Sequence, residues 1–204
     1  MNAAHYELLV EEPSMENFLH ACLPRLLANR ATYAVHPFQG KDDLMKKLEG
    51  RLRGYAAFMP EDWRIVVLVD RDDDDCRQLK TSLERICSKA GLKSKTASKQ
   101  QWQVATRIAI EELEAWYFGD WQAVKAAFPR VAPTVDKQQT YRSPDAVRGG
   151  TWEAFERVMQ RYGYFNEGLP KLSAARSIGA HIDPTRSVSP SFKAFCQAIS
   201  CATH

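Results

Sequence analysis

The sequence predicts an α/β fold built on a parallel sheet, and three observations lead to that prediction. Between residues 5 and 110, short apolar segments alternate with longer segments whose apolar residues recur at helical spacing. Residues 65–69 form an unbroken aliphatic run, which is typical of a strand buried on both faces by helices. A length of 204 residues, with 45% hydrophobic and 26% charged residues, suits a single globular domain.

The first half of the predicted sheet comes from two strands near the N-terminus. Residues 5–10 form the first strand, and Ser14 is expected to cap the helix that follows it. Residues 32–35 form a short second strand, after which Asp42 or Asp43 opens another helix. The apolar positions that define these two helices are Met15, Phe18, Leu19, Cys22 and Leu26 in the first, and Leu44, Leu48 and Leu52 in the second.

Two further strands complete the predicted sheet. The strand at residues 65–69 leads into a helix that ends at Gly91. Residues 104–110 favour a strand, although their mixed composition also allows a helix. The apolar positions of the helix between these strands are Leu79, Leu83, Ile86 and Ala90.

The rest of the chain is predicted to be helical apart from one long loop. Residues 129–150 are rich in Pro, Thr, Ser, Gln and Gly, as expected for a loop. We therefore divide the chain into an α/β core, residues 1–128, and a mainly helical extension, residues 129–204, that packs on it. The expected helices are residues 111–118 and 121–128, which Gly119 separates, a helix capped by Thr151, and residues 173–178 and 191–200.

Charge is distributed unevenly along the chain. The net charge of +3 is too small to indicate a nucleic-acid-binding protein by itself. Residues 121–204 contain eleven Lys and Arg against six Asp and Glu, a balance of +5, which leaves −2 for residues 1–120. The basic half would attract phosphate, although scattered solvated charges would give the same count.

The sequence also indicates the compartment. The N-terminus lacks the basic region of a signal peptide, and no segment approaches the roughly 18 apolar residues that span a bilayer. We therefore expect a cytoplasmic protein that does not enter a membrane. The five cysteines include no CxxC pair, so we expect reduced structural thiols rather than disulfides or a zinc site; they are Cys22, Cys76, Cys87, Cys196 and Cys201.

The strongest chemical signal is the segment VVLVDRDDDD, residues 66–75. Asp70 ends a buried strand, and Asp72 follows two residues later. Ligands bind beyond the carboxyl ends of the strands in open parallel sheets, so these two carboxylates are expected to converge on one site. Hard cations such as Mg²⁺ prefer oxygen ligands of this kind. The aspartates at residues 73–75 are expected instead to cap the following helix.

Other motifs also place acidic residues after an apolar strand. Phosphatases of the haloacid-dehalogenase type have Thr or Val where this chain has Asp74, and an EF-hand loop needs Gly where it has Asp75. A response-regulator receiver combines an early acidic couple with one phosphorylated Asp. The couple Glu11-Glu12 leaves that alternative open.

The first strand ends in acid as well, in the segment LLVEEPSME, residues 8–16. A glutamate after the first strand and Asp-x-Asp after a later one is the arrangement of the Toprim domain, which this chain resembles from about Tyr6 to Asp120. The segments EELEAW and GLPKLSAARSIGAHIDP are similar to those of an uncharacterised family of stand-alone Toprim-like proteins. That resemblance covers nearly the whole chain and implies a Toprim-like, Rossmann-like core flanked by helices.

The resemblance implies a role for each acid at the strand ends. Glu11 would be the Toprim glutamate, acting as general acid or base or as a metal ligand, and Asp70 and Asp72 would hold Mg²⁺ or Mn²⁺. Glu16 would be the second acid that nuclease-type members place one helical turn after the first, and one metal ion or two are both open at this level. Glu12 stands where Toprim proteins usually have Gly, and Glu16 is four residues beyond Glu12 rather than Glu11, so both Glu11 and Glu12 are candidates for the key position.

Further site candidates lie later in the chain. Among the three glutamates of EELEAW we select Glu114 as a metal ligand, with a solvated helix face as the alternative for all three. Lys171 is the residue expected to stabilise negative charge at a scissile phosphate, and Lys41 and Arg176 are further candidates for that role. The five tryptophans are expected mainly in the core, because no nucleic-acid stacking stripe is evident.

The expected activity is Mg²⁺- or Mn²⁺-dependent hydrolysis of phosphodiester bonds in DNA or RNA. The resemblance also suggests an ATPase as partner protein and a role in defence against phage or mobile DNA. Two alternatives remain open at this level: a non-catalytic Toprim-like binding or regulatory module, and a small-molecule phosphotransfer enzyme.

Overall fold

Four parallel strands form the centre of the molecule, so the predicted α/β fold with a parallel sheet is confirmed. The computed structural model describes residues 3–147 and 149–199. Residues 104–110, for which a helix was the alternative, contain the fourth strand. The strands are β1 (His5–Val10), β2 (Thr32–Pro37), β3 (Trp63–Asp70) and β4 (Val104–Ala109), in the order β2-β1-β3-β4.

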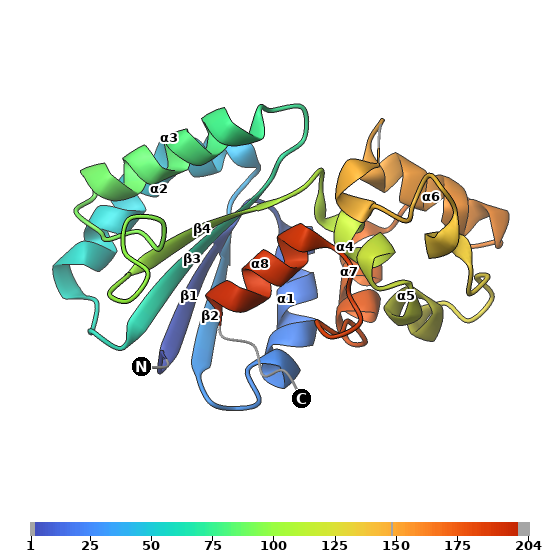
Figure 1. The fold of residues 1–204 in the computed structure, drawn as a ribbon, viewed down its shortest axis with the longest axis horizontal. Coiled ribbons are helices and arrows are strands. Elements are labelled where there is room, and N and C mark those ends of the chain that lie inside the picture. The colour runs from blue at the N-terminus through green and yellow to red at the C-terminus, as the bar shows by residue number, and fades with distance from the viewer. Residues whose placement is uncertain (1–2, 148, 200–204) are drawn as a thin grey trace.

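Helices cover both faces of this sheet, because the connection after β1 leads toward one edge of the sheet and the later connections lead toward the other edge. α1 (Pro13–Leu26) leads from β1 to β2 on one side of β1, whereas α2 (Lys41–Phe58) and α3 (Cys76–Lys89) lead to β3 and β4 on the other side. Right-handed crossovers then place α1 on one face and α2 with α3 on the opposite face, as Figure 1 shows.

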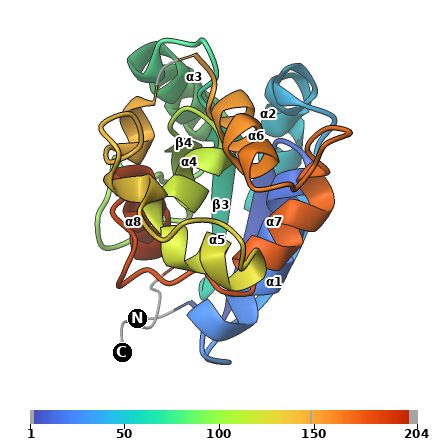
Figure 2. The same ribbon diagram turned by 90° about the vertical axis from the view of Figure 1, so that its right-hand side faces the viewer.

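The C-terminal helices add to the α1 side of the sheet. They are α4 (Leu113–Gly119), α5 (Trp121–Ala127), α6 (Thr151–Arg161), α7 (Lys171–Gly179) and α8 (Pro190–Ala198). α7 packs against α1 and α8 packs against β4, while Figure 2 shows α4 to α7 grouped together in front of the sheet. The described part of residues 129–150 contains only two short 3-10 turns, Val135–Lys137 and Pro144–Ala146.

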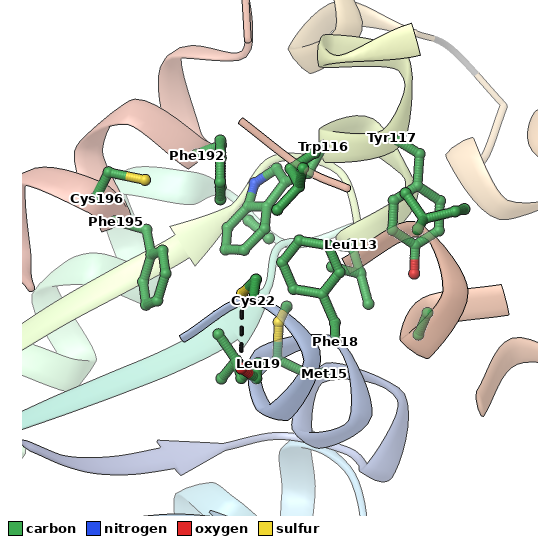
Figure 3. Close-up of a cluster of buried hydrophobic side chains, with 14 of the residues drawn as sticks. Met15, Phe18, Leu19, Cys22, Leu113, Trp116, Tyr117, Phe192, Phe195 and Cys196 are labelled. Atoms are coloured by element: carbon green, nitrogen blue, oxygen red, sulfur yellow. Dashed lines mark hydrogen bonds between the residues drawn. The ribbon is translucent and has the colours of Figure 1, made fainter. Parts of the chain in front are cut away.

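The two faces of the sheet have different cores. Under α2 and α3 the buried side chains are mainly aliphatic, such as Leu48 and Leu83. On the other face, Phe18 of α1, Trp116 of α4 and Phe195 of α8 belong to one aromatic cluster, which Figure 3 shows. The ring centroids of Trp116 and Phe195 lie 5.3 Å apart. Rigid rings packed at this distance fix α4 firmly against the sheet.

Two predicted helix caps are wrong, each for a local reason. Ser14 does not cap α1, because Pro13 has no backbone N–H to satisfy and occupies the first helical position, which makes Glu12 the N-cap. Thr151 does not cap α6, because Gly150 takes the N-cap position with a φ of 82° and Thr151 becomes the first helical residue.

The remaining differences from the predicted elements are small. Asp75 caps α3 as predicted, since its carboxylate accepts hydrogen bonds from the backbone N–H groups of Arg77 and Gln78. Ser200, predicted as the end of the last helix, lies outside the described residues. The boundaries that move include the end of β2 at Pro37, the two ends of α2 at Lys41 and Phe58, and the starts of β3, α4 and α7 at Trp63, Leu113 and Lys171. Gly119 does not separate the two helices as predicted, because it is the last residue of α4 and Asp120 lies between α4 and α5.

The cysteines within the described residues form no disulfide, in agreement with the expected reduced thiols; they are Cys22, Cys76, Cys87 and Cys196. Cys201 lies outside the part of the chain that the structure describes. None of the described helices is both long enough and apolar enough to cross a membrane.

Candidate functional site

The candidate site lies where the order of strands reverses. β1 and β3 are neighbours, but the chain leaves β1 toward β2 and leaves β3 toward β4. Such a reversal opens a crevice beyond the carboxyl ends of the two strands, where ligands bind in open parallel sheets. Glu11 directly follows β1 and Asp70 ends β3. The backbone N–H of Asp70 donates a hydrogen bond of 3.0 Å to Oε2 of Glu11, so the two acids lie side by side.

Asp70 is a buried acid whose hydrogen bonding is incomplete. The residue is 6% exposed, and its Oδ1 has no hydrogen-bond partner among the described residues. Burial, followed by the negative charges of Glu11 and Glu114, raises the pKa of Asp70 well above its ordinary value. A buried carboxylate in these surroundings costs free energy unless it holds a proton or a cation.

Glu11 has a pKa in the neutral range. Burial raises the pKa of Glu11 to about 7, and the negative charges of Asp72 and Glu12 act in the same direction. The backbone N–H of Asp70 and the positive charge of Lys41 oppose this effect. Glu11 can therefore both accept and release a proton near neutral pH.

The other two glutamates of the first acidic segment occupy different positions. Glu12 accepts a hydrogen bond from the hydroxyl of Ser14, and its charge raises the pKa of Asp70. Glu16 lies one turn along α1, where its carboxylate is 3.9 Å from Nε2 of His20. The structure thus brings Glu12 into electrostatic reach of Asp70 and pairs Glu16 with a histidine.

A further acid comes from α4. Every residue of this helix is buried, because side chains such as Leu113, Trp116 and Tyr117 pack against α1 and α8 (Figure 3). Glu114 is therefore held inside the protein at 3% exposure, and burial raises its pKa to about 7. Its charge also raises the pKa of Asp70. We call Glu11, Glu12, Asp70 and Glu114 the acid cluster.

Lys171 faces the acid cluster from the C-terminal extension. It is the first residue of α7, and its Nζ lies 5.0 Å from the ring centroid of Trp152. Burial acts to lower the pKa of Lys171, but the negative charges of Glu114, Glu12 and Glu112 outweigh burial and raise it. Lys171 is therefore a cation at neutral pH.

A close contact between two helices sets the position of Lys171. A Cβ atom at Gly179 would lie 2.7 Å from the backbone oxygen of Phe18, so glycine is required for α7 to approach α1 this closely. Lys171 and Glu12 each lie about two turns before this contact. The negative charge of Glu12 acts on Lys171, so the starts of the two packed helices lie near each other. Arg176, the other basic candidate on α7, is exposed.

Asp72 lies at the rim of the site rather than inside it. Its φ is 49°, and its side chain is 45% exposed. Nζ of Lys41 donates hydrogen bonds to Asp72 over 2.7 Å and to Asp74 over 2.8 Å. The two acids of the Asp-x-Asp motif therefore differ, because Asp72 is paired with a lysine whereas Asp70 is buried with an unpartnered oxygen.

Glu112 has a role that the sequence does not reveal. Its carboxylate accepts hydrogen bonds from the backbone N–H groups of Thr151 and Trp152 and from the hydroxyl of Thr151. It thus caps α6 from 39 positions away in the sequence, where no local pattern could indicate it. Glu111 pairs with Arg71. The alternative of a solvated helix face is therefore wrong for these two residues, and for the buried Glu114.

The acid cluster suits some metal ions better than others. Within residues 3–147 and 149–199, no group of three or more His, Cys, Asp or Glu side chains is arranged to hold a metal ion. Zinc sites need at least three such ligands, whereas Mg²⁺ commonly uses one or two carboxylates and completes its shell with water and substrate phosphate. The free oxygen of Asp70 beside Glu11 fits an ion of the second kind.

A protein-family model matches the part of the chain that contains the candidate site. The family model described as "Domain of unknown function (DUF4276)" matches residues 10–200. The chain belongs to the DUF4276 family. The expected membership of an uncharacterised family is thus confirmed, and the DUF4276 match contains both the acid cluster and Lys171. No curated protein and no solved structure matches the chain.

Proposed function

We propose that this DUF4276 protein is a Mg²⁺- or Mn²⁺-dependent nuclease with a Toprim-type acidic site. The observation that carries the proposal is the unpartnered Oδ1 of Asp70, which is buried at the strand-order reversal beside Glu11. An acid held this way destabilises the folded chain, and a ligand cation would offset that cost.

Asp70 and Glu11 are the residues proposed to hold the ion, with Glu12, Glu114 and Asp72 close enough for their charges to act on Asp70. The bound ion would polarise a phosphodiester and stabilise the negative charge of the leaving oxygen. Within the described residues, the acids are not arranged as a complete metal site. This is compatible with an ion that takes some of its oxygen ligands from water and from the substrate phosphate.

Two residues of the chain would supply proton transfer and charge stabilisation. Where Asp70 holds the ion and Glu11 does not bind it directly, Glu11, with a pKa of about 7, would take a proton from the attacking water. Lys171 faces the same acids as a cation and would stabilise the negative charge that develops on the phosphoryl oxygens. The resemblance to Toprim proteins supports DNA or RNA as substrate, and it extends the proposal to a partner ATPase and to defence against phage or mobile DNA.

A non-catalytic binding or regulatory module is the second candidate, and Lys41 favours it. The amine of Lys41 already neutralises Asp72 and Asp74, which leaves less of the Asp-x-Asp motif free for a metal ion. A chain that supplies its own counter-charge here can keep its fold without an ion.

A cleavage assay on plasmid DNA, single-stranded DNA, RNA and transfer RNA, with Mg²⁺ or Mn²⁺, tests the proposal. We expect metal-dependent cleavage by the wild type and roughly 100-fold or greater loss of turnover in Asp70→Asn and Glu11→Gln. These near-isosteric changes remove carboxylate charge without opening a cavity. Lys171→Ala should lower kcat more than it raises KM, because its charge matters most in the transition state.

Glu61→Gln is the matched control for the loss of a carboxylate. Glu61 is exposed in the turn before β3, at the opposite end of that strand from Asp70, and its replacement should leave turnover unchanged. A wild-type protein that cleaves none of the four nucleic acids with either ion, alone or with an ATPase encoded beside it, would favour the binding module.

A further inference from the structure

A groove runs between α2 and the edge strand β2. β2 ends the sheet, and its side chains Tyr33 and Val35 pack on the α1 side. On the other face, α2 packs mainly over β1 and β3, so His36 of β2 stays partly exposed. Two pockets beside α2 share His36, Gly50 and Arg51 and therefore adjoin. We call this continuous depression the α2 groove.

Two glycines leave space on the α2 side of this groove. Gly50 and Gly54 are one helical turn apart, and both line the groove. A Cβ atom at either position would meet nothing within 4 Å. Glycine inside a helix is less favourable than alanine, and no contact within the described chain requires it at these positions. The open space above the two residues is therefore available to a flat group from a ligand.

Positive charge lines one part of the α2 groove. Lys46, Lys47 and Arg51 recur along one side of the helix and all line it. Asp43 also lines this part, but its carboxylate pairs with Lys47. The three cations outnumber this acid, so a ligand that carries several negative charges fits the groove.

The remaining acid of the groove is already bound to other side chains. Glu7 of β1 is 7% exposed, accepts a hydrogen bond of 2.9 Å from the Tyr55 hydroxyl, and lies 2.6 Å from Nε2 of His36. These contacts hold Glu7 at the floor of the groove.

The far end of the α2 groove is aromatic. Phe58 is 66% exposed, and its ring centroid lies 5.7 Å from that of Tyr55. Trp63, which the sequence placed in the core, is only half-buried and lines the same end. Exposed rings beside positive charge are the combination that binds single-stranded nucleic acids, since their bases are free to stack.

The α2 groove connects with the proposed catalytic site. Gln39 lines the groove and also a second pocket, whose charged lining residues are Lys41, Glu11 and the four aspartates Asp42, Asp72, Asp73 and Asp74. A phosphate backbone would cross this acidic pocket with a cation between the two sets of negative charge. A ligand strand could thus pass from the acid cluster along α2 to Phe58. The 18 residues of α2 span about 27 Å, which is long enough for several nucleotides.

We propose that the α2 groove binds the single-stranded nucleic acid on which the acid cluster acts. Phosphates contact Lys46, Lys47 and Arg51, and a base stacks at Phe58 above the glycine surface. The inference rests on the proposed nuclease function, because it names the form of substrate and the path by which it reaches the site.

Fluorescence anisotropy tests the groove without cleavage. Fluorescein-labelled DNA and RNA single strands, and a DNA duplex, are titrated with the full chain in EDTA. We expect tighter binding of either single strand than of the duplex. Arg51→Gln should raise Kd about tenfold and reduce the slope of log Kd against log salt by ~0.7, the value for one lost phosphate contact on a single strand. Arg53→Gln is the control, because Arg53 lies on α2 outside the groove and pairs with Glu49.

A second pair of variants tests the open space rather than the charge. Gly50→Gln adds a neutral side chain over the groove and should raise Kd at least fivefold, while its melting temperature stays at or above that of the wild type. Ala57→Gln makes a comparable change at an exposed position of α2 that does not line the groove, and it should leave Kd unchanged.

The outcomes separate this inference from the proposed function. Equal Kd values for Arg51→Gln and Arg53→Gln, or tighter binding of the duplex, would overturn it. So would a dimer in solution that Gly50→Gln disperses, because a second copy would then occupy the groove. If Asp70→Asn abolishes cleavage and Arg51→Gln leaves it unchanged, the nuclease proposal stands and the proposed role of the α2 groove is wrong. If single strands bind through the groove but the wild-type protein cleaves no nucleic acid with either ion, the nuclease proposal is wrong and the groove remains a nucleic-acid-binding surface.

Discussion

Strand β1 and the residue after it carry two acids four positions apart whose surroundings differ. Glu7 accepts a hydrogen bond from Tyr55 and contacts the rings of His36 and His5. Glu11 accepts a hydrogen bond from the backbone N–H of Asp70, and further acids surround it. The first acid has side-chain partners on three sides, whereas the second has one backbone donor and lies between the positive charge of Lys41 and the negative charges of neighbouring acids.

This difference teaches how to separate acids of the fold from acids of a site. A buried carboxylate with donors around it is a stable part of the structure. A buried carboxylate among other acids raises the free energy of the folded state, and it persists where a ligand or a reaction needs it. By this criterion Glu7 is an acid of the fold, while Glu11, Asp70 and Glu114 are the acids that we propose for a site.

The largest effect on stability should come from Glu114→Gln. Burial raises the pKa of Glu114 from an ordinary 4.5 to about 7, so the folded chain keeps a proton that the unfolded chain releases. This stabilising contribution is complete below pH 4.5 and is lost as pH rises through 7. Between pH 5 and pH 8 the wild type should lose roughly 2.5 kcal/mol more of its free energy of unfolding than the variant does. Urea denaturation at both pH values measures the free energy of unfolding. If the wild type and the variant lose the same amount, the pKa of Glu114 is not raised and this acid is stabilised by its surroundings, as Glu7 is.

A smaller effect should come from Tyr55→Phe, which removes a partner from Glu7. The pKa of Tyr55 is raised to about 12 by burial and by its hydrogen bond to Glu7, so the hydroxyl keeps its proton and donates. Its loss should lower the free energy of unfolding by about 2 kcal/mol at neutral pH. Tyr162→Phe, at the half-buried end of α6, serves as control in the same denaturation experiment. If both variants lose the same amount, the hydrogen bond to Glu7 contributes nothing specific.

The smallest effect concerns binding of a metal ion to the site acids. At ten times its Kd, Mg²⁺ or Mn²⁺ should add about 1.4 kcal/mol to the stability of the wild type, which corresponds to roughly 3–5 °C in melting temperature. Asp70→Asn should reduce this rise to near zero, and Glu61→Gln should keep it. A rise of the same size in Asp70→Asn would indicate only nonspecific ion binding.

Local sequence patterns could predict the strands and the buried acid that ends β3. The aliphatic run before Asp70 predicted β3 correctly, and the acid at its end led to the candidate site, because both signals lie within a few adjacent residues. The order of strands and the reversal between β1 and β3 depend on pairings between distant segments, which periodicity does not report. Lys171 came from the resemblance to a family, since nothing in its own surroundings separates it from a surface lysine.

The interactions that the sequence did not reveal all join distant residues. Lys41 reaches Asp72 across 31 positions, and Glu112 reaches Thr151 across 39. Tyr55 and Glu7 are 48 positions apart. Polar residues of these types occur throughout any soluble chain, so their pairing follows only from the packed fold.

The place of Lys171 in the chain has a consequence for the time at which the site becomes complete. Its acids come from β1, β3 and α4, whereas the lysine that balances them comes from α7, after the long loop of residues 129–150. A ribosome delivers the N-terminal elements first, and contacts between distant segments form slowly. A chain still being synthesised therefore holds the acids before it holds their counter-charge. Docking of α7 onto α1 at Gly179 completes the site only when synthesis is nearly finished.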